Sequence, residues 1–167
     1  MKRFGLTIGV IACATILLWS FGFNARAAGD PKAEITAIEN KVLAATTADQ
    51  LMPFYDAKQI VIYDFVPGLQ YVGEKAVRDD VNNFFINAEE LKVTFVDLQV
   101  FTDGTMGVAY SIQHVAWKDQ KSGTPKEMTF RVTDCYHKIH GAWKIFHFHA
   151  SVPVDPVTGK GEMHLTK

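Results

Sequence analysis

FRVTDCYHKIHGAWKIFHFH, residues 130–149, carries the strongest fold signal in this chain. Two runs rich in β-branched and aromatic residues flank a short turn at residues 140–141, which predicts a β-hairpin. Extending a two-residue loop in register sets Asp134 opposite His147, and His149 follows on the same face as His147. We therefore expect a carboxylate and two imidazoles within a mostly apolar sheet face, a combination typical of a pocket wall.

The first 27 residues have the pattern of a secretory signal peptide. Lys2 and Arg3 precede an uncharged run over residues 4–23, and Ala25-Arg26-Ala27 matches a small-x-small cleavage site. A run of about 20 residues is also long enough to span a bilayer, so an uncleaved membrane anchor is the alternative. Cleavage after Ala27 predicts a periplasmic or secreted protein that has no membrane segment after processing.

The chain that follows the cleavage site is long enough for one domain with its own core. Losing the three basic residues of the signal leaves 14 basic residues against 18 acidic ones, a net charge of −4. Without a basic patch or run, we expect no nucleic-acid partner. Cys135 is then the remaining cysteine, so no internal disulfide is expected. It falls on the opposite strand phase from Asp134 and has no basic neighbour, which indicates packing rather than nucleophilic chemistry.

Hydrophobic spacing predicts an α+β domain over residues 28–152 and a loop-like tail at residues 153–167. A helix should begin at Asp30-Pro31, where an N-cap precedes a first-turn proline. A short second helix, a strand and a long helix follow at residues 51–55, 59–65 and 74–88. Four long strands come next, at residues 91–101, 105–117, 127–139 and 142–152. This order predicts helices that cover one face of a curved antiparallel sheet, a cone whose open end is a natural ligand site.

Several segments resemble SnoaL-like domains of the nuclear transport factor 2-like and ketosteroid isomerase-like superfamily. Four segments resemble the C-terminal signature of these domains: RVTDCY at 131–136, GAWKI at 141–145, HFH at 147–149 and SVPVD at 151–155. Two segments nearer the N-terminus, YDF at 63–65 and GEKAVR at 73–78, resemble the strand–loop–helix segment of the same group. The resemblance implies a cone-shaped fold (α-α-β-α-β-β-β-β) with an internal pocket. Members include isomerases, cyclases, dehydratases and proteins without an established activity, so the fold alone does not fix a function.

The resemblance also implies roles for two aspartates. The general-base aspartate of ketosteroid isomerases sits at the end of the first strand, where Asp64 stands here. Their oxyanion-hole aspartic acid sits on the penultimate strand, where Asp134 stands. The oxyanion tyrosine belongs on the first helix, where this chain has Lys41, a departure that argues against steroid isomerisation. Relatives often carry a glutamate between the last two histidines, and this chain has Phe148.

Strand alternation supports an acid–base site and suggests its lining. Asp134 shares the apolar phase of its strand, so we expect it to face the core, where His147 would be its general acid–base partner. The alternative for this pair is a buried hydrogen bond that fixes the hairpin register. For Asp64, the alternative to proton abstraction is a turn cap before Pro67.

Other side chains are expected to line the same cavity. The candidates for ligand binding are His114, His149, Tyr63 and Tyr110. Three histidines and a carboxylate could bind zinc or iron, but His-x-His spacing is common, and we expect neither a metal nor another cofactor.

Three functional hypotheses remain open from the sequence. The first is a cofactor-free isomerase, cyclase or dehydratase acting on a small apolar ligand that bears a carbonyl or hydroxyl. In it Asp64 moves the proton, while Asp134 and His147 bind or polarise the oxygen. The second is a binding module with the same cavity and no turnover. The third is an assembly domain, a homodimer formed through the outer sheet face, for which Phe146 and Phe148 are the candidate contacts.

Overall fold

The computed structural model describes residues 29–167, so the expected signal peptide lies outside the described residues. Three helical segments precede or interrupt the first strands: α1 (Pro31–Ala44), α2 (Ala48–Leu51) with the 3-10 turn η1 (Met52–Phe54), and α3 (Gly73–Asn87). The strands are β1 (Val61–Tyr63), β2 (Tyr71–Val72), β3 (Ala88–Thr102), β4 (Met106–Asp119), β5 (Pro125–Ile139) and β6 (Ala142–Ser151). Between residues 29 and 167, no helix is both long enough and apolar enough to cross a membrane.

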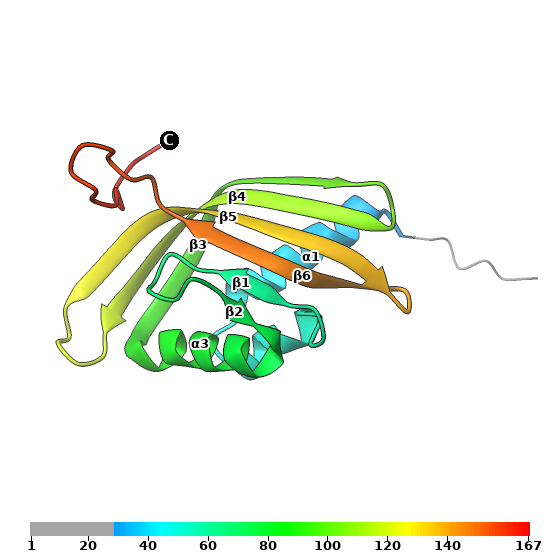
Figure 1. Ribbon diagram of the computed structural model, residues 1–167, viewed down its shortest axis with the longest axis horizontal. Helices are drawn as coiled ribbons and strands as arrows, with labels where there is room; N and C mark the ends of the chain where they lie inside the picture. Colours follow the sequence, from blue (N-terminus) through cyan, green and yellow to red (C-terminus); the bar gives the residue numbers. More distant parts are fainter. Residues whose placement is uncertain (1–28) are drawn as a thin grey trace, which may run out of the picture.

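The six strands form one open, strongly curved sheet in the order β2-β1-β6-β5-β4-β3. β1 runs parallel to β6, and the other neighbours are antiparallel. Figure 1 shows the long strands arching over α3, with α1 lying along the same inner side. The α+β cone predicted from the sequence is confirmed. The strand β2 was not predicted, because its two residues are too few to show a hydrophobic period.

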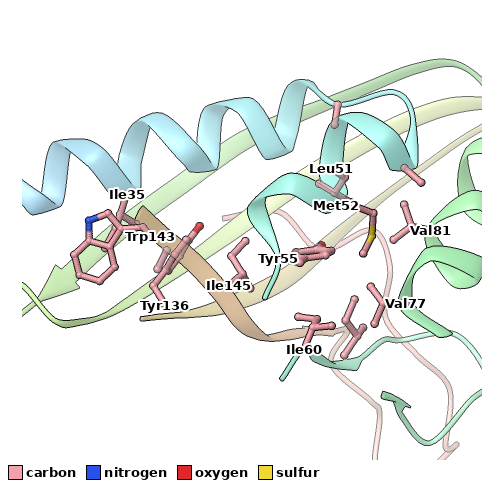
Figure 2. Packing of buried hydrophobic residues seen from close by; sticks show 14 of the residues in the cluster. Ile35, Leu51, Met52, Tyr55, Ile60, Val77, Val81, Tyr136, Trp143 and Ile145 are labelled. Carbon is pink, nitrogen blue, oxygen red and sulfur yellow. The ribbon is translucent and has the colours of Figure 1, made fainter. Parts of the chain in front are cut away.

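The core lies between α1 and the inner face of the sheet. The Asp30 side chain caps α1 by accepting from the N–H of Lys32 at 3.0 Å. Ile35 of α1 is fully buried and packs with Tyr136 and Trp143 of the hairpin, as Figure 2 shows. A second cluster fills the other end of the sheet, formed by Val115, Met128, Phe130, Val132 and Ala150. These two clusters leave a hollow between them, and the site lies there.

A β-bulge in β6 changes the expected hairpin register. The pairs next to the turn are as predicted, with Tyr136 opposite Ile145. The next pair is Cys135 with His147, so Phe146 is an extra residue that has no partner on β5. Beyond the bulge, Asp134 faces Phe148 rather than His147. Because the side-chain period of a strand is two, one inserted residue moves every later side chain of β6 to the other face of the sheet.

Gly107 provides a test of the packing between α1 and β4. A Cβ at this position would lie 2.5 Å from Cδ1 of Ile35 and 3.4 Å from the Phe101 carbonyl oxygen. We predict that Gly107→Ala lowers the free energy of unfolding by about 1–3 kcal/mol, the usual cost of overpacking a core. Urea unfolding measures this change.

The matched control is Ile35→Val, which removes the clashing Cδ1 atom. On its own it should cost about 0.5–1.5 kcal/mol. The double variant should be more stable than the sum of the two single changes predicts. Strict additivity would show that this contact does not limit the approach of α1 to the sheet.

Candidate functional site

An apolar pocket of about 150 Å³ lies between the inner face of the sheet and the helices. Its walls are mostly aliphatic and aromatic: Val42, Leu43, Ala45, Leu51, Ile62, Phe65, Val81, Phe84, Phe85, Leu91, Val93, Val115, Phe130 and Phe148. Five polar side chains also line it: Tyr55, Asp64, Asp80, Gln113 and Asp134. A mostly apolar cavity with a few convergent polar groups is the usual form of a small-molecule site. The two aspartates singled out from the sequence therefore line one cavity.

Asp64 follows the last residue of β1 and lies half-buried at the pocket. The N–H of Phe65 donates to its Oδ1 atom at 2.6 Å, so it also acts as the turn cap considered from the sequence. Burial raises the pKa of Asp64 to about 6; the hydrogen bond from the Phe65 N–H works against this rise, and the nearby Asp80 carboxylate adds to it. A carboxylate with this pKa is ionised at neutral pH but binds a proton more readily than an ordinary aspartate. These properties suit a general base.

Asp134 lies at the inner end of the pocket within a group of buried acidic side chains. It is 1 % exposed, and Glu39 of α1, which lies close enough to influence its pKa, is also 1 % exposed. The Tyr136 hydroxyl donates to Oε1 of Glu39 at 2.6 Å, and Figure 2 shows this hydroxyl pointing toward α1. Burial, and then the charge of Glu39, raise the pKa of Asp134 well above its usual range. Burial therefore favours the protonated form of Asp134.

Sequence reasoning missed Glu39, and its spacing was the available signal. Glu39 lies four residues after Ile35 and three before Val42, on the buried side of α1. A carboxylate inside an apolar helical stripe is rarely buried without a partner. Lys41, which occupies the aligned position of the oxyanion tyrosine, is exposed.

The expectation that His147, His149 and Tyr63 face the cavity is wrong. The bulge turns both histidines to the outer face of the sheet, where Tyr63 of β1 lies beside them. The Tyr63 ring meets the ring of His147 edge-on at 4.8 Å and that of His149 at 5.8 Å. The Nδ1 atom of His147 hydrogen-bonds the Val61 carbonyl at 2.9 Å, which ties β6 to β1. None of these three side chains reaches Asp134.

The expectation that His114 and Tyr110 line the cavity is also wrong. The inward phase of β4 is the other one, formed by Ala109, Ser111, Gln113 and Val115. His114 lies on the outer face, 3.5 Å from a carboxylate oxygen of Glu127, and Tyr110 is 47 % exposed. The apolar content of the His114 phase reflects an exposed hydrophobic outer face rather than the core. In the part of the chain that the structure describes, no group of three His, Cys, Asp or Glu side chains is arranged to hold a metal.

The bulge changes the face of Phe148, whereas Cys135 keeps the expected phase opposite Asp134 and now pairs with His147. Phe148 points inward and lines the pocket, so it cannot form an outer-face contact as expected. Cys135 lies half-buried on the outer face beside His147. Burial raises the pKa of its thiol, which disfavours the thiolate needed for nucleophilic chemistry.

A sequence model of the SnoaL-like domain matches residues 35–155. This chain belongs to the SnoaL-like domain family. A search of curated proteins finds no match.

Solved structures share the fold of this SnoaL-like protein. A nuclear transport factor 2-like protein of unknown function from Pseudomonas putida KT2440 aligns with a TM-score of 0.73 and 21 % identity, over 81 % of this chain and 96 % of that one. A nuclear transport factor 2-like superfamily protein from Salmonella enterica serovar Typhimurium aligns with a TM-score of 0.68 and 18 % identity, over 78 % and 96 %. A ketosteroid isomerase-like protein from Erwinia carotovora atroseptica aligns with a TM-score of 0.64 and 14 % identity, over 74 % and 96 %. At these identities the likeness concerns the fold.

The raised pKa of Asp64 predicts how stability depends on pH. Its ordinary pKa is 3.8 and its folded-state pKa is about 6, so its contribution to stability is complete below 3.8 and is lost as the pH rises through 6. Asp64→Asn removes this loss. We expect the variant to gain up to about 3 kcal/mol relative to the native protein between about pH 4 and about pH 8, measured by urea unfolding.

Asp103→Asn is the control of opposite sign. Hydrogen bonds from the backbone N–H groups of Met106 and Thr105 lower the pKa of Asp103. That variant should therefore lose stability relative to the native protein as the pH rises. If Asp64→Asn shows no gain toward high pH, the Asp64 carboxylate is not buried in the way described.

Proposed function

We propose that this SnoaL-like protein is an exported acid–base enzyme of the isomerase, cyclase or dehydratase type. Its ligand is a small apolar molecule that bears a carbonyl or hydroxyl, and its reaction uses no cofactor. It acts in the periplasm or outside the cell after cleavage of residues 1–27. The proposal rests above all on one observation: the half-buried Asp64 and the fully buried Asp134 both have raised pKa values and line the same apolar pocket.

The two aspartates support different roles because their environments differ. Asp64, with a pKa of about 6, is ionised at neutral pH and can accept a proton from a bound ligand. Asp134 is fully buried and keeps its proton, so it can hydrogen-bond an oxygen of the ligand without adding a charge. Two carboxyl groups with separated pKa values are the usual basis for assigning a base and a partner acid. His147 has no part in this mechanism, because it lies on the other face of the sheet.

A proton-exchange assay tests Asp64 without knowledge of the natural substrate. Small cyclic ketones are incubated with the protein in D₂O, and deuterium incorporation next to the carbonyl is followed by NMR. We expect the native rate to rise with pH through about 6, as Asp64 ionises. Asp64→Asn should lower this rate by about 100-fold or more, the usual contribution of a general base.

The control for this assay is Asp79→Asn. Asp79 lies on the exposed side of α3, paired with Lys75 at 2.6 Å, and is not among the pocket residues. This variant should keep the native exchange rate. Retained exchange in Asp64→Asn would eliminate Asp64 as the base. Ligand binding without exchange in the native protein would favour the alternative of a non-catalytic binding module.

A specific surface favours homodimer formation as a second property. Four exposed apolar side chains gather on the outer face where β3 pairs with β4: Phe101, Met106, Val108 and Tyr110. Phe101 and Tyr110 stack with their ring centroids 5.8 Å apart. Contiguous exposed apolar patches on soluble proteins mark interaction sites. A second copy of the chain could cover this patch through a two-fold contact between sheet faces.

Sedimentation of the mature protein tests the dimer. We expect the native protein to sediment as a dimer and the double variant Phe101→Lys, Tyr110→Lys as a folded monomer, because charges replace the stacked rings. Leu69→Lys is the control, since Leu69 is 95 % exposed in the loop between β1 and β2 and should not affect association. A monomeric native protein at micromolar concentration would rule the dimer out.

A further inference from the structure

One amide side chain in the pocket wall keeps most of its hydrogen-bonding capacity free. Gln113 of β4 lines the pocket and is 9 % exposed, so its amide is withdrawn from bulk water. Its Nε2 atom donates to Oγ of Ser111 at 3.0 Å, and this is the one hydrogen bond of the Gln113 side chain within residues 29–167. An amide side chain can accept two hydrogen bonds and donate two. The oxygen and one N–H hydrogen of Gln113 are therefore free.

The free amide oxygen of Gln113 borders the pocket. Among residues 29–167, Oδ1 of Asp134 is the one fully enclosed side-chain polar atom that lacks a partner. The Gln113 oxygen also lacks a partner, so it is not fully enclosed, and the open space beside this side chain is the pocket that it lines. Ser111 lies on the same strand face, so the hydrogen bond directs the amide nitrogen along β4 and leaves the oxygen for a bound molecule.

Gln113 and Asp64 line the pocket from different walls. The strand order β1-β6-β5-β4 puts three inter-strand steps between them, roughly 14 Å along the sheet. The register sets Tyr63, the last residue of β1, level with Tyr110 of β4, so Asp64 and Gln113 lie at nearly the same height. The long strands arch over the helices (Figure 1), so the two side chains enter the hollow from two sides. A ligand between them would present one polar group to each.

We propose that Gln113 binds a hydroxyl group of the ligand, so that the pocket selects a hydroxyketone, with its carbonyl on the Asp64 side and its hydroxyl on the Gln113 side. The inference rests on the proposed function, since it concerns the same pocket. It narrows the ligand from a molecule with a carbonyl or a hydroxyl to a molecule that carries both. A hydroxyl can donate to the amide oxygen and accept from the free N–H, whereas a second ketone or an ether can only accept.

The charge and polarity of the pocket disfavour other groups beside Gln113. The pocket contains Asp64, Asp80 and Asp134, and among residues 29–167 none of its lining residues is a lysine, an arginine or a histidine. A carboxylate on the ligand would therefore be buried beside acids and without a cation, which is costly. A methyl group would leave the amide oxygen with neither water nor a partner. Sites that bind a hydroxyl strongly reject analogues that lack it, for this reason.

Two pairs of ketones with equal heavy-atom counts test the inference at two lengths. The first pair is 4-hydroxycyclohexanone and 4-methylcyclohexanone, and the second is 4-(2-hydroxyethyl)cyclohexanone and 4-propylcyclohexanone. Dissociation constants are measured by NMR titration, which requires no turnover. We expect the hydroxyl member of at least one pair to bind at least about tenfold more tightly than its alkyl partner. Equal binding, or tighter binding of the alkyl member, in both pairs would overturn the inference.

The deuterium-exchange assay on the same four ketones separates this inference from the proposed function. Exchange without a hydroxyl preference overturns the inference and leaves the proposed function standing. A hydroxyl preference without exchange supports the role of Gln113 in binding and overturns the enzymatic function. If none of the four ketones binds, both are overturned.

Substitution of Gln113 tests the assignment to this side chain. Gln113→Leu removes the amide at similar volume, so the hydroxyl member should bind about tenfold more weakly and the alkyl member at least as tightly as in the native protein. The matched control is Gln99→Leu. Gln99 is exposed on β3, donates to Asp97 at 3.2 Å and is not among the pocket residues, so this variant should keep the native preference. A folded Gln113→Leu protein that keeps the preference would overturn the assignment, and the ketone pairs test the inference on the native protein without any substitution.

Discussion

The fold tolerates acidic side chains in its interior because each has a defined hydrogen-bond partner or stays neutral. An isolated ionised carboxylate is among the most costly groups to bury. Here α1 contributes the carboxyl group of Glu39 and β5 that of Asp134 to the same interior region. The Tyr136 hydroxyl, which donates to Glu39, and the raised pKa of Asp134, which favours its neutral form, lower this cost. This pairing joins the first helix to the middle of the sheet, since Glu39 and Tyr136 are 97 residues apart in the chain. The packing of Ile35 against the same strand depends on the same approach of α1.

The β-bulge at Phe146 then separates the two faces of the sheet chemically. On the inner side it leaves Phe148 opposite Asp134, so the pocket wall beside the acid is apolar and desolvates it. On the outer side it collects both histidines of β6 beside Tyr63. A bulge bends its strand and increases the local twist, and the long strands of this sheet need such curvature to enclose a hollow. One inserted residue therefore contributes both to the shape of the cavity and to its composition.

The sequence was sufficient for the fold because its signals there are long and redundant. Four strands, the turn at His140-Gly141 and the cap at Asp30-Pro31 each have several residues in agreement. It was sufficient to place Asp64 and Asp134 at the pocket, because the bulge in β6 does not change their faces. Asp64 follows β1, and Asp134 lies on β5, the strand opposite the bulge. It failed for His147 and His149 because Phe146-His147-Phe148-His149 alternates two residue types, and the alternation alone does not show which type faces inward. It failed for His114 because an exposed apolar outer face imitates a core, and for Glu39 because its buried partners are distant in sequence.

The proposed mechanism depends on an Asp134 side chain that stays protonated at the wall of the apolar pocket. Infrared difference spectroscopy at about pH 8 tests it most directly, because at that pH Asp64, with a pKa of about 6, is ionised. The account predicts a carbonyl band of a neutral carboxylic acid that shifts in D₂O and disappears in Asp134→Asn. A native spectrum without such a band, or one whose band survives that substitution, would contradict the account.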